Sequence, residues 1–231
     1  MDFHFILVEP AVPENIGSSA RALKTMGFNS LRLVNPCDHL AEMAFRIAHG
    51  SSEILKNAKI FSDFDQAIKD LDFLICTTSK KRSVKYDYYS CDELPDIINR
   101  KAGVLNNIGI AFGREESGLT NEQIKKADIV SYIPMTSDYP SLNLSQAVMI
   151  YAYFLSVSTV MIGDRQSIKP HGSEMSVLRQ KVAGILTEIN IDSDTNLYNR
   201  IMERLGVLGG EDIHLILSVC NKIAERFANK N

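Results

Sequence analysis

The feature that most constrains the fold of this chain is the alternation of short apolar runs with amphipathic segments over residues 3–157. Continuous apolar runs bounded by polar turns are typical of strands that are buried on both faces. Apolar residues at three- and four-residue spacing indicate helices with one buried face. The predicted strands are Phe3–Val8, Leu31–Val34, Ile60–Phe61, Phe73–Thr77, Ile108–Phe112 and Ile129–Met135. The predicted helices are Asn15–Met26, Leu40–Ala48, Asp63–Asp70, Asp92–Lys101, Glu122–Ala127 and a long one that begins after Asn143.

This alternation predicts an α/β fold with a mostly parallel sheet that is covered by helices on both faces. Residues suited to helix ends support the assignment, because side-chain oxygens satisfy the free N–H groups of a first turn and glycine can end a helix. The expected caps are Asn15, Ser62, Thr120 with Gln123, and Asn143 with Gln146, and Gly27 is the expected helix stop.

Polar loops directly follow several of the predicted strands. They are Glu9–Asn15, Thr77–Lys85, Gly113–Leu119 and Thr136–Asn143. The carboxyl ends of parallel strands lie at one edge of the sheet, and ligands of such sheets bind outside that edge. The sequence therefore predicts that these loops converge on a ligand site.

Beyond residue 160 the composition changes, and the sequence predicts a main domain over 1–160, a linker over 161–173 and a helical C-terminal extension over 174–231. The extension contains three predicted amphipathic helices, Glu174–Ile189, Leu197–Leu205 and Ile213–Phe227. A unit of this size buries too little surface to be stable alone. We expect it to pack on the main domain or on a second subunit.

Composition excludes several classes of protein. The 231 residues contain no apolar run long enough for a membrane span and no signal-peptide pattern. The scattered cysteines Cys37, Cys76, Cys91 and Cys220 predict neither a disulfide framework nor a zinc site, and a reducing cytoplasm fits them best. A net charge of −3 is unusual for a general polyanion binder, although a specific RNA enzyme needs only a local basic patch.

The candidate basic patch is Lys80-Lys81-Arg82 with Lys85, and the tyrosines 86, 88 and 89 follow it. Lysine and arginine can bind phosphates, and tyrosine rings can stack on bases. The same residues are also typical of a solvated loop whose aromatic rings cover the edge of a sheet. The patch alone does not decide between these two interpretations.

Two segments combine small and charged residues in a way that could form part of a binding or catalytic site. At 15–21, a helix start with small residues would let the backbone approach a phosphate, and Arg21 follows one to two turns later. At 112–119, two glycines flank three charged side chains at the end of a strand. The alternatives are a capped helix with a surface arginine and a solubilising turn.

Together with Ile-Pro-Met and Ser-Leu-Asn at 133–143, these segments form an ordered set: Asn-x-Gly-x-x-x-Arg, Gly-x-Glu-x-x-Gly-Leu and Ile-Pro-Met…Ser-Leu-Asn. The set resembles the three motifs of the SPOUT family of RNA 2′-O-ribose methyltransferases, and the phrases Leu-Val-Glu-Pro at 7–10 and Phe-Gly-Arg-Glu at 112–115 are similar to its TrmJ group. The resemblance covers roughly residues 3–157.

The resemblance implies a trefoil knot near the carboxyl end of the sheet, S-adenosylmethionine as the methyl donor, a homodimer, and tRNA or rRNA as the substrate. For the TrmJ group the target is the pyrimidine at position 32 of the tRNA anticodon loop. The cofactor residues implied by matching positions are Thr77, Thr78, Ser79, Gly113, Ile133, Pro140, Ser141 and Leu142. The RNA-contacting candidates are Asn15, Arg114, Lys80, Lys81 and Arg82.

The catalytic candidates implied by the motifs are Arg21, Ser141, Asn143 and Glu115. A ribose hydroxyl is a poor nucleophile at neutral pH, so the reaction needs alignment and help with the proton. An arginine, with a pKa above ~12, is an awkward base, so we expect Arg21 to stabilise alkoxide charge or to grip the neighbouring phosphate. Ser141 and Asn143 would shape the acceptor side, Glu115 would fix the loops, and Asn15 would organise them.

Other chemistries lack their patterns in this sequence. The histidines are scattered without metal-ligand spacing, so no metal is expected, and neither a Gly-x-Gly-x-x-Gly loop nor a P-loop is present. Two alternatives to the enzyme stay open at this point. One is a module with the knotted fold that binds RNA or a nucleotide without methyl transfer. The other is an unrelated α/β nucleotide-binding protein whose loops mimic the motifs.

Overall fold

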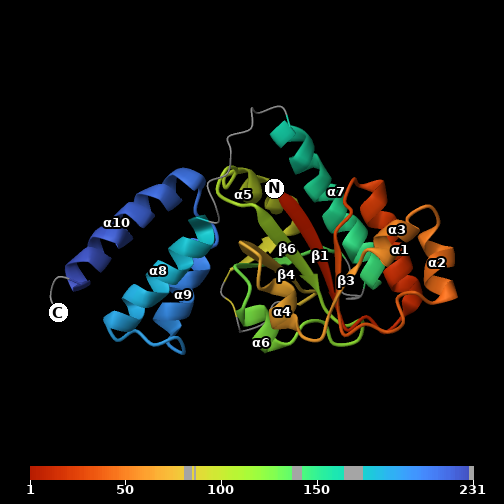
Figure 1. Cartoon of the computed structure of the whole chain (residues 1–231), viewed down its shortest axis with the longest axis horizontal. Coiled ribbons are helices and arrows are strands. Elements are labelled where there is room, and N and C mark those ends of the chain that lie inside the picture. The colour runs from red at the N-terminus through yellow and green to blue at the C-terminus, as the bar shows by residue number, and fades with distance from the viewer. Residues whose placement is uncertain (81–84, 86, 137–141, 164–173, 229–231) are drawn as a thin grey trace.

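The structure, a computed structural model, describes residues 1–80, 85, 87–136, 142–163 and 174–228. At its centre is a seven-stranded sheet of order β3-β2-β1-β6-β4-β7-β5 (Figure 1). The strands are β1 (Asp2–Val8), β2 (Leu31–Val34), β3 (Lys59–Phe61), β4 (Phe73–Thr77), β5 (Tyr88–Ser90), β6 (Asn107–Phe112) and β7 (Ile129–Tyr132). Every pair of neighbouring strands is parallel, which confirms the predicted parallel sheet.

The parallel register brings the carboxyl ends of four neighbouring strands together. Leu7 pairs with Phe112, and Cys76 with Ala111. Thr77 in turn pairs with Ser131. The loops that leave β1, β6, β4 and β7 therefore begin side by side at one edge of the sheet, as predicted.

Two apolar cores cover the two faces of the sheet because side chains alternate along each strand. The larger core takes the face with Phe5 and Ile110 and packs it against α1, α2, α3, α5 and α7. The smaller core takes the face with Ile6 and Ala111 and packs it against α4 and α6. Helices on both faces confirm the predicted fold class.

The helices of the main part are α1 (Pro13–Thr25), α2 (Glu42–Ala48), α3 (Ser52–Lys56), α4 (Phe64–Ile68), the 3-10 turn η1 (Cys91–Glu93), α5 (Leu94–Asn99), α6 (Asn121–Lys125) and α7 (Leu144–Gly163). The short α3 and β5 were not predicted. Strand β7 is shorter than the predicted 129–135, so Ile133 lies in the loop that follows it.

The predicted helix ends are partly right. Thr120 and Gln123 form the expected capping box of α6. Asn143 accepts the N–H of Ser145 at 2.9 Å and donates its own N–H to Gln146, as expected for the start of α7. Gly27, at φ +83°, ends α1 where the Phe28 N–H donates to the Leu23 carbonyl.

Two of the predicted helix caps are not the residues that cap the helices in the structure. Helix α1 begins at Pro13 after Val12, because proline fixes the first-turn φ and has no N–H to satisfy, so Asn15 lies inside the first turn. For α4 the cap is Asp63, which accepts the N–H of Gln66, and not Ser62.

The C-terminal helices α8 (Glu174–Glu188), α9 (Asn196–Leu205) and α10 (Gly210–Ala228) form a layer beside the sheet, at the opposite end of the molecule from α1–α3 (Figure 1). Their contacts with the main part are both apolar and polar. Buried residues such as Met175 and Leu205 belong to the larger core. Arg179 pairs with Asp128 at 2.6 Å, and the Gly210 N–H donates to the Arg100 carbonyl. The extension therefore packs on the main part of its own chain, one of the two arrangements expected. The predicted linker lies almost wholly in 164–173, outside the described residues.

Candidate active site

A cavity of about 370 Å³ opens at the carboxyl ends of β4, β6 and β7, where the start of α7 completes its wall. The structure brings together six of the eight predicted cofactor residues on this wall: Thr77, Thr78, Ser79, Gly113, Ile133 and Leu142. The predicted residues Pro140 and Ser141 lie outside the described residues. Lys80, Arg114 and Glu115 also line the cavity. Loops from distant parts of the sequence thus converge where the parallel sheet predicts a ligand site.

Gly113 permits the close approach of two backbone segments at this cavity. A Cβ atom at this position would lie 2.0 Å from the Gly118 carbonyl carbon and 2.1 Å from the Leu119 nitrogen. Gly118 has φ +69°, a conformation that favours glycine, and its N–H donates to the Arg114 carbonyl at 2.9 Å. The loop closes tightly on itself, so side chains larger than hydrogen are excluded at Gly113.

Asn15, Glu115 and Asn143 form a hydrogen-bonded chain beside the cavity. The Asn15 amide donates to a Glu115 carboxylate oxygen at 3.0 Å, and the Asn143 amide donates to the Asn15 oxygen at 2.8 Å. The other Glu115 oxygen accepts the Ala11 N–H at 3.2 Å. Asn15 is 8% exposed, and neither it nor Asn143 is part of the cavity wall. This chain ties the starts of α1 and α7 to the loop after β6.

Arg114, a predicted RNA contact, binds Glu9 in this structure. Its Nε donates to a Glu9 carboxylate oxygen at 2.8 Å and its Nη2 to the other, a two-point geometry that arginine and carboxylate favour. Glu9 has φ +49°, which is rare for a residue with a side chain. The pair joins the loops after β1 and β6, and both side chains are about one third exposed.

The inner wall of the cavity is held by β7 and α7. The Thr78 N–H donates to the Ser131 carbonyl at 2.9 Å, which continues the β4–β7 pairing past the strand end. The Tyr151 hydroxyl lies 3.1 Å from Ser131 Oγ. Burial raises the pKa of the Tyr151 phenol, so its hydroxyl keeps its proton and donates to the serine.

Arg21 lies on α1 but is exposed and is not among the residues that line the cavity of its own chain. The glycine of the same motif does not face a ligand either. A Cβ atom on Gly17 would lie 2.3 Å from the Ala44 carbonyl oxygen, so Gly17 allows α1 to pack closely against α2. The expectation that small residues here let the backbone approach a ligand is therefore wrong for Gly17.

The basic patch is only partly visible in the described residues. Lys80 is exposed at the cavity, whereas Lys81 and Arg82, like Tyr86, lie outside the described residues. Lys85 Nζ donates to the Ala127 carbonyl at 3.0 Å. Tyr88 and Tyr89 belong to the edge strand β5 and pack, partly buried, against the two cores.

Sequence reasoning missed several residues of the cavity wall. Leu144, Ala147 and Tyr151 line it from one face of α7. Their spacing of three and four residues marks them as one helical face, but the same spacing is typical of core residues. Only the position of α7 at the carboxyl edge shows that part of this face is turned toward a cavity.

No group of three or more His, Cys, Asp or Glu side chains that could hold a metal ion occurs among the residues that the structure describes. His4 instead bonds Ser30 Oγ and Asn107 Oδ1. All four cysteines are free. Within the same described ranges, none of the helices combines the length and apolar character needed to cross a membrane.

Comparison with known proteins places this arrangement among methylases. A model of the SpoU rRNA Methylase family matches residues 2–153, and a model of the C-terminal domain of the tRNA/rRNA methyltransferase LasT matches residues 173–227. The LasT protein of Escherichia coli strain K12, described as an uncharacterized tRNA/rRNA methyltransferase, is 38% identical over 217 residues, which cover 94% of each chain.

A further relative is the tRNA (cytidine-2′-O-)-methyltransferase TrmJ of Methanocaldococcus jannaschii, which is 42% identical over 151 residues, 64% of each chain. Among solved structures, that of "a probable methylase family protein" from Haemophilus influenzae Rd KW20 is similar with a TM-score of 0.67 and 27% identity. The match covers 99% of this chain and 98% of the other.

Proposed function

Since the chain belongs to the SpoU rRNA methylase family, we propose that it transfers a methyl group from S-adenosylmethionine to a ribose 2′ oxygen of RNA. The observation that carries this proposal is the cavity at the carboxyl ends of β4, β6 and β7. Its wall contains residues of the second and third motifs, and Asn15 of the first motif is bonded to Glu115 on that wall. Residues of all three motifs, which are far apart in sequence, thus lie together, and this supports a common site.

The cavity fits a nucleoside-type cofactor in size and lining. A volume of about 370 Å³ lies in the range of small-molecule sites, and such sites combine apolar walls with a few polar groups. Ile133 and Leu142 would contact the flat base, and backbone groups of the Thr77–Lys80 and Gly113 segments would bind its polar edge and the ribose. S-adenosylmethionine would supply an electrophilic methyl group on a sulfonium centre.

The hydrogen-bonded chain of Asn15, Glu115 and Asn143 would hold the acceptor side of the site in place. Each member has at least one hydrogen bond to a distant segment, so the loops keep their relative positions before RNA arrives. Preorganisation of this kind lowers the barrier because the reacting groups need not be aligned during the reaction. We therefore assign Glu115 and Asn15 positioning roles, and Ser141 remains a proposed acceptor-side residue.

Arg21 would stabilise the charge that develops on the 2′ oxygen or grip the adjacent phosphate, because a guanidinium keeps its proton at neutral pH. Arg21 is exposed and absent from the cavity wall of its own chain. We propose that the active form is a homodimer, in which the partner's Arg21 reaches the cavity. The trefoil knot of the SPOUT fold is part of the same proposal.

For the substrate we propose tRNA, with the pyrimidine ribose at position 32 of the anticodon loop as the target. The support is the relative named as a tRNA (cytidine-2′-O-)-methyltransferase and the TrmJ-like phrases in the sequence. Lys80, which is exposed at the cavity, and the neighbouring Lys81 and Arg82 would contact the RNA backbone. Such an enzyme would act in the cytoplasm, where tRNA is processed.

The proposal is tested by incubating the protein with isotope-labelled S-adenosylmethionine and unmodified tRNA or rRNA, and then identifying the labelled nucleosides and their positions by mass spectrometry. We expect 2′-O-methylcytidine or 2′-O-methyluridine from tRNA, at position 32. Label that is found only in rRNA would show that the substrate is rRNA and not tRNA. Binding of S-adenosylhomocysteine without any methylated RNA would favour the non-catalytic binding module, and absence of binding would favour an unrelated nucleotide-binding protein.

The shared site is tested by mixing two inactive variants. Arg21→Ala keeps an intact cavity, and Gly113→Ala keeps an intact Arg21. If the partner supplies Arg21, one site of each mixed dimer is complete, and random exchange restores about a quarter of the wild-type activity. If Arg21 acts on the cavity of its own chain, the mixture stays inactive. A monomer in solution would contradict the homodimer directly.

A further inference from the structure

The wall of the cavity carries charged side chains of both signs, which are Lys80, Arg114, Glu115 and Glu116. Arg114 is paired with Glu9, which balances its charge. Glu115 accepts hydrogen bonds only from uncharged N–H groups, so these contacts leave its negative charge uncompensated. Once the Arg114 pair is set aside, one lysine and two glutamates remain, and the described part of the wall therefore has a net negative charge.

Glu116 lies at the tip of the tight loop that follows β6. The Gly118 N–H donates to the Arg114 carbonyl at 2.9 Å, and these two residues form a bridge between the two arms of the loop. The base of the loop is fixed by backbone contacts, because Gly113 and Gly118 leave no room for a Cβ atom between them. Within the described residues, the exposed side chain of Glu116 has no hydrogen-bond or ion-pair partner, so its carboxylate is available to a ligand in the cavity.

The proposed methyl donor and its product differ in charge. S-adenosylmethionine has a net positive charge, because its sulfonium and ammonium groups outweigh one carboxylate. S-adenosylhomocysteine has a neutral thioether in place of the sulfonium and therefore no net charge. Attraction between opposite charges extends over several ångströms, although water and salt weaken it at an exposed position. A carboxylate on the cavity wall therefore stabilises the bound donor more than the bound product.

We propose that Glu116 is a specificity-determining residue, which gives the cavity a preference for the cationic donor over the neutral product. The inference rests on the proposed use of the cavity for S-adenosylmethionine. The product is held less firmly than the donor in this account, so a new donor molecule replaces it more easily after each methyl transfer. Lys80 places a positive charge on the same wall and acts in the opposite sense.

The test measures dissociation constants by calorimetry, without RNA, for the full-length protein and three ligands. They are S-adenosylmethionine, S-adenosylhomocysteine and sinefungin, an analogue that has a protonated amine in place of the sulfonium and cannot transfer a methyl group. Glu116→Gln should weaken the binding of the two cationic ligands about threefold and leave S-adenosylhomocysteine within about 1.5-fold. The threefold loss should shrink when the salt concentration rises from about 0.05 M to about 0.5 M.

Two further substitutions test whether charge is the cause. Lys80→Gln removes a positive charge from the same wall, so it should strengthen the binding of the two cationic ligands about twofold relative to S-adenosylhomocysteine. Glu116→Asp keeps the negative charge and should keep the wild-type preference. Opposite shifts from the two charge removals, with retention in the aspartate variant, are the result that an electrostatic role predicts and a merely structural role does not.

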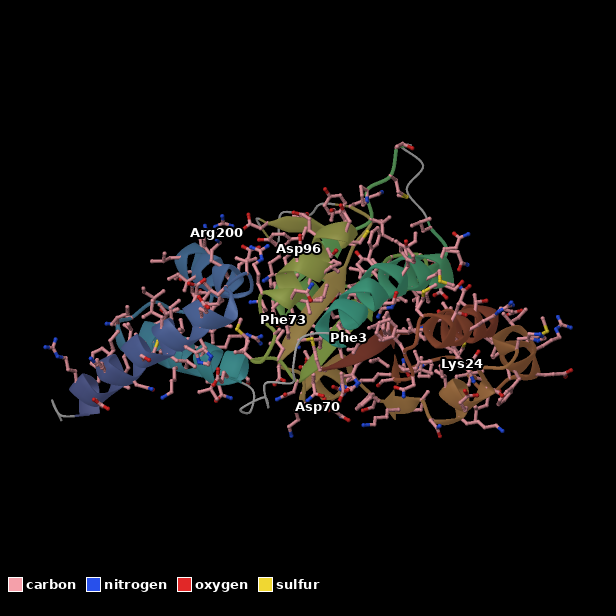
Figure 2. The ribbon with its side chains drawn as sticks, turned by 90° about the horizontal axis from the view of Figure 1, so that it is seen from above. Phe3, Lys24, Asp70, Phe73, Asp96 and Arg200 are labelled. Carbon is pink, nitrogen blue, oxygen red and sulfur yellow. The ribbon has the colours of Figure 1, made fainter. Side chains whose placement is uncertain are left out.

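Matched controls separate a charge on the wall from a change in net charge. Glu122→Gln removes an exposed carboxylate from α6, and Lys24→Gln removes an amine that pairs with Glu53. Neither Glu122 nor Lys24 lines the cavity, and Figure 2 shows Lys24 at the end of the molecule opposite the C-terminal helices. Both variants should bind all three ligands like wild type. Thermal unfolding checks that each variant folds, and Glu116→Ser is a second variant without the charge should Glu116→Gln fail to fold.

The outcomes distinguish this inference from the proposed function. If wild type binds the ligands and Glu116→Gln binds all three equally well, the inference is wrong and the proposed function stands. Equal losses for all three ligands would also overturn it, because they would indicate a contact with a group that the ligands share. If wild type binds none of the three, the proposed cofactor is wrong and this inference fails with it.

Discussion

The two edges of the sheet carry polar groups in contrasting arrangements. At the carboxyl edge, Glu115 and Asn143 are partly or fully exposed, and they connect loops around a cavity. At the amino edge, Asp128 and Lys101 are buried between the sheet and the C-terminal extension, and they contact protein groups there. Polar groups at one edge are therefore accessible to a ligand, whereas those at the other edge join two parts of the chain.

The contrast shows that a displaced pKa does not by itself identify an active site. Burial lowers the pKa of Lys101 to about 8, and it raises the pKa of Asp128 despite the neighbouring Arg179. Such shifts are common at catalytic groups but also arise in structural ion networks. Here Lys101 and Asp128 lie at the joint with the extension, where Lys101 donates to a carbonyl and Asp128 pairs with Arg179. The following substitutions test this division, from the largest expected effect to the smallest.

Gly113→Ala should abolish methyl transfer and weaken S-adenosylhomocysteine binding by about two orders of magnitude, because the added Cβ displaces the loop after β6. A displacement near 1 Å in an active site can cost about a hundredfold. Calorimetry and methyl-incorporation rates measure both effects. Gly184→Ala, with open space around its Cβ on α8, is the control and should bind like wild type. Normal binding by Gly113→Ala would place the cofactor elsewhere.

Asn15→Ala should lower the transfer rate about tenfold to a hundredfold and destabilise the fold by ~1–3 kcal/mol, because it removes the two hydrogen bonds to Glu115 and Asn143, each of which contributes about 0.5–1.5 kcal/mol. Steady-state kinetics and denaturant unfolding report the two quantities. The exposed Asn29→Ala, just beyond α1, should change neither. A loss of stability without any loss of rate would make Asn15 purely structural.

Lys101→Met should stabilise the fold by about 1 kcal/mol at pH 7, because removal of the buried charge outweighs the lost hydrogen bond to the Leu208 carbonyl. The folded-state pKa of Lys101 is lowered to about 8 from an ordinary value of 10.5, so the unfolded chain binds more protons between these values. Wild-type stability therefore gains from this group as pH rises from about 8 to 10.5.

The advantage of Lys101→Met should accordingly shrink over that pH window. Free energies of unfolding in urea at pH 7, 8, 9 and 10 measure it, and Lys222→Met on the exposed surface of α10 controls for net charge. An advantage that is constant with pH would show that folding does not lower the pKa of Lys101.

The Glu9–Arg114 pair should have the smallest effect on stability, about 0.2–1 kcal/mol in a double-mutant cycle with Glu9→Gln and Arg114→Gln, because both side chains are about one third exposed. Measurements of RNA affinity distinguish whether Arg114 contacts RNA or only holds the loops together. If Arg114 leaves Glu9 to bind RNA, Arg114→Gln weakens RNA binding and Glu9→Gln strengthens it. Equal affinities would restrict Arg114 to holding the loops.

Much of the fold follows from local sequence. The strands 3–8, 31–34, 73–77 and 108–112 were predicted within one residue, because their apolar runs are continuous and bounded by polar turns. Strand β5 was not predicted because Tyr-Tyr-Ser contains no aliphatic run, and its structure depends on pairing with β7. The predicted cap at Asn15 is wrong because Pro13, whose ring fixes φ, begins the helix two residues earlier.

The site was predictable only in outline. The parallel sheet and the motifs indicated which loops converge, and the described cofactor candidates do lie on one cavity wall. The bonds of Asn15 to Glu115 and Asn143 could not be derived, since these residues are 100 and 128 positions apart in sequence. The role of Gly17 depends on the position of α2, which residues 15–21 do not encode.

The measurement that tests the central claim most directly compares two properties of the Arg21→Ala protein with those of wild type. We predict that methyl transfer to tRNA falls by at least about a thousandfold, the size expected for loss of a group that stabilises developing charge, while the dissociation constant of S-adenosylhomocysteine stays within about twofold. Parallel losses of both transfer and binding, or retained transfer, would contradict a site in which the cavity holds the methyl donor and Arg21 acts on the acceptor.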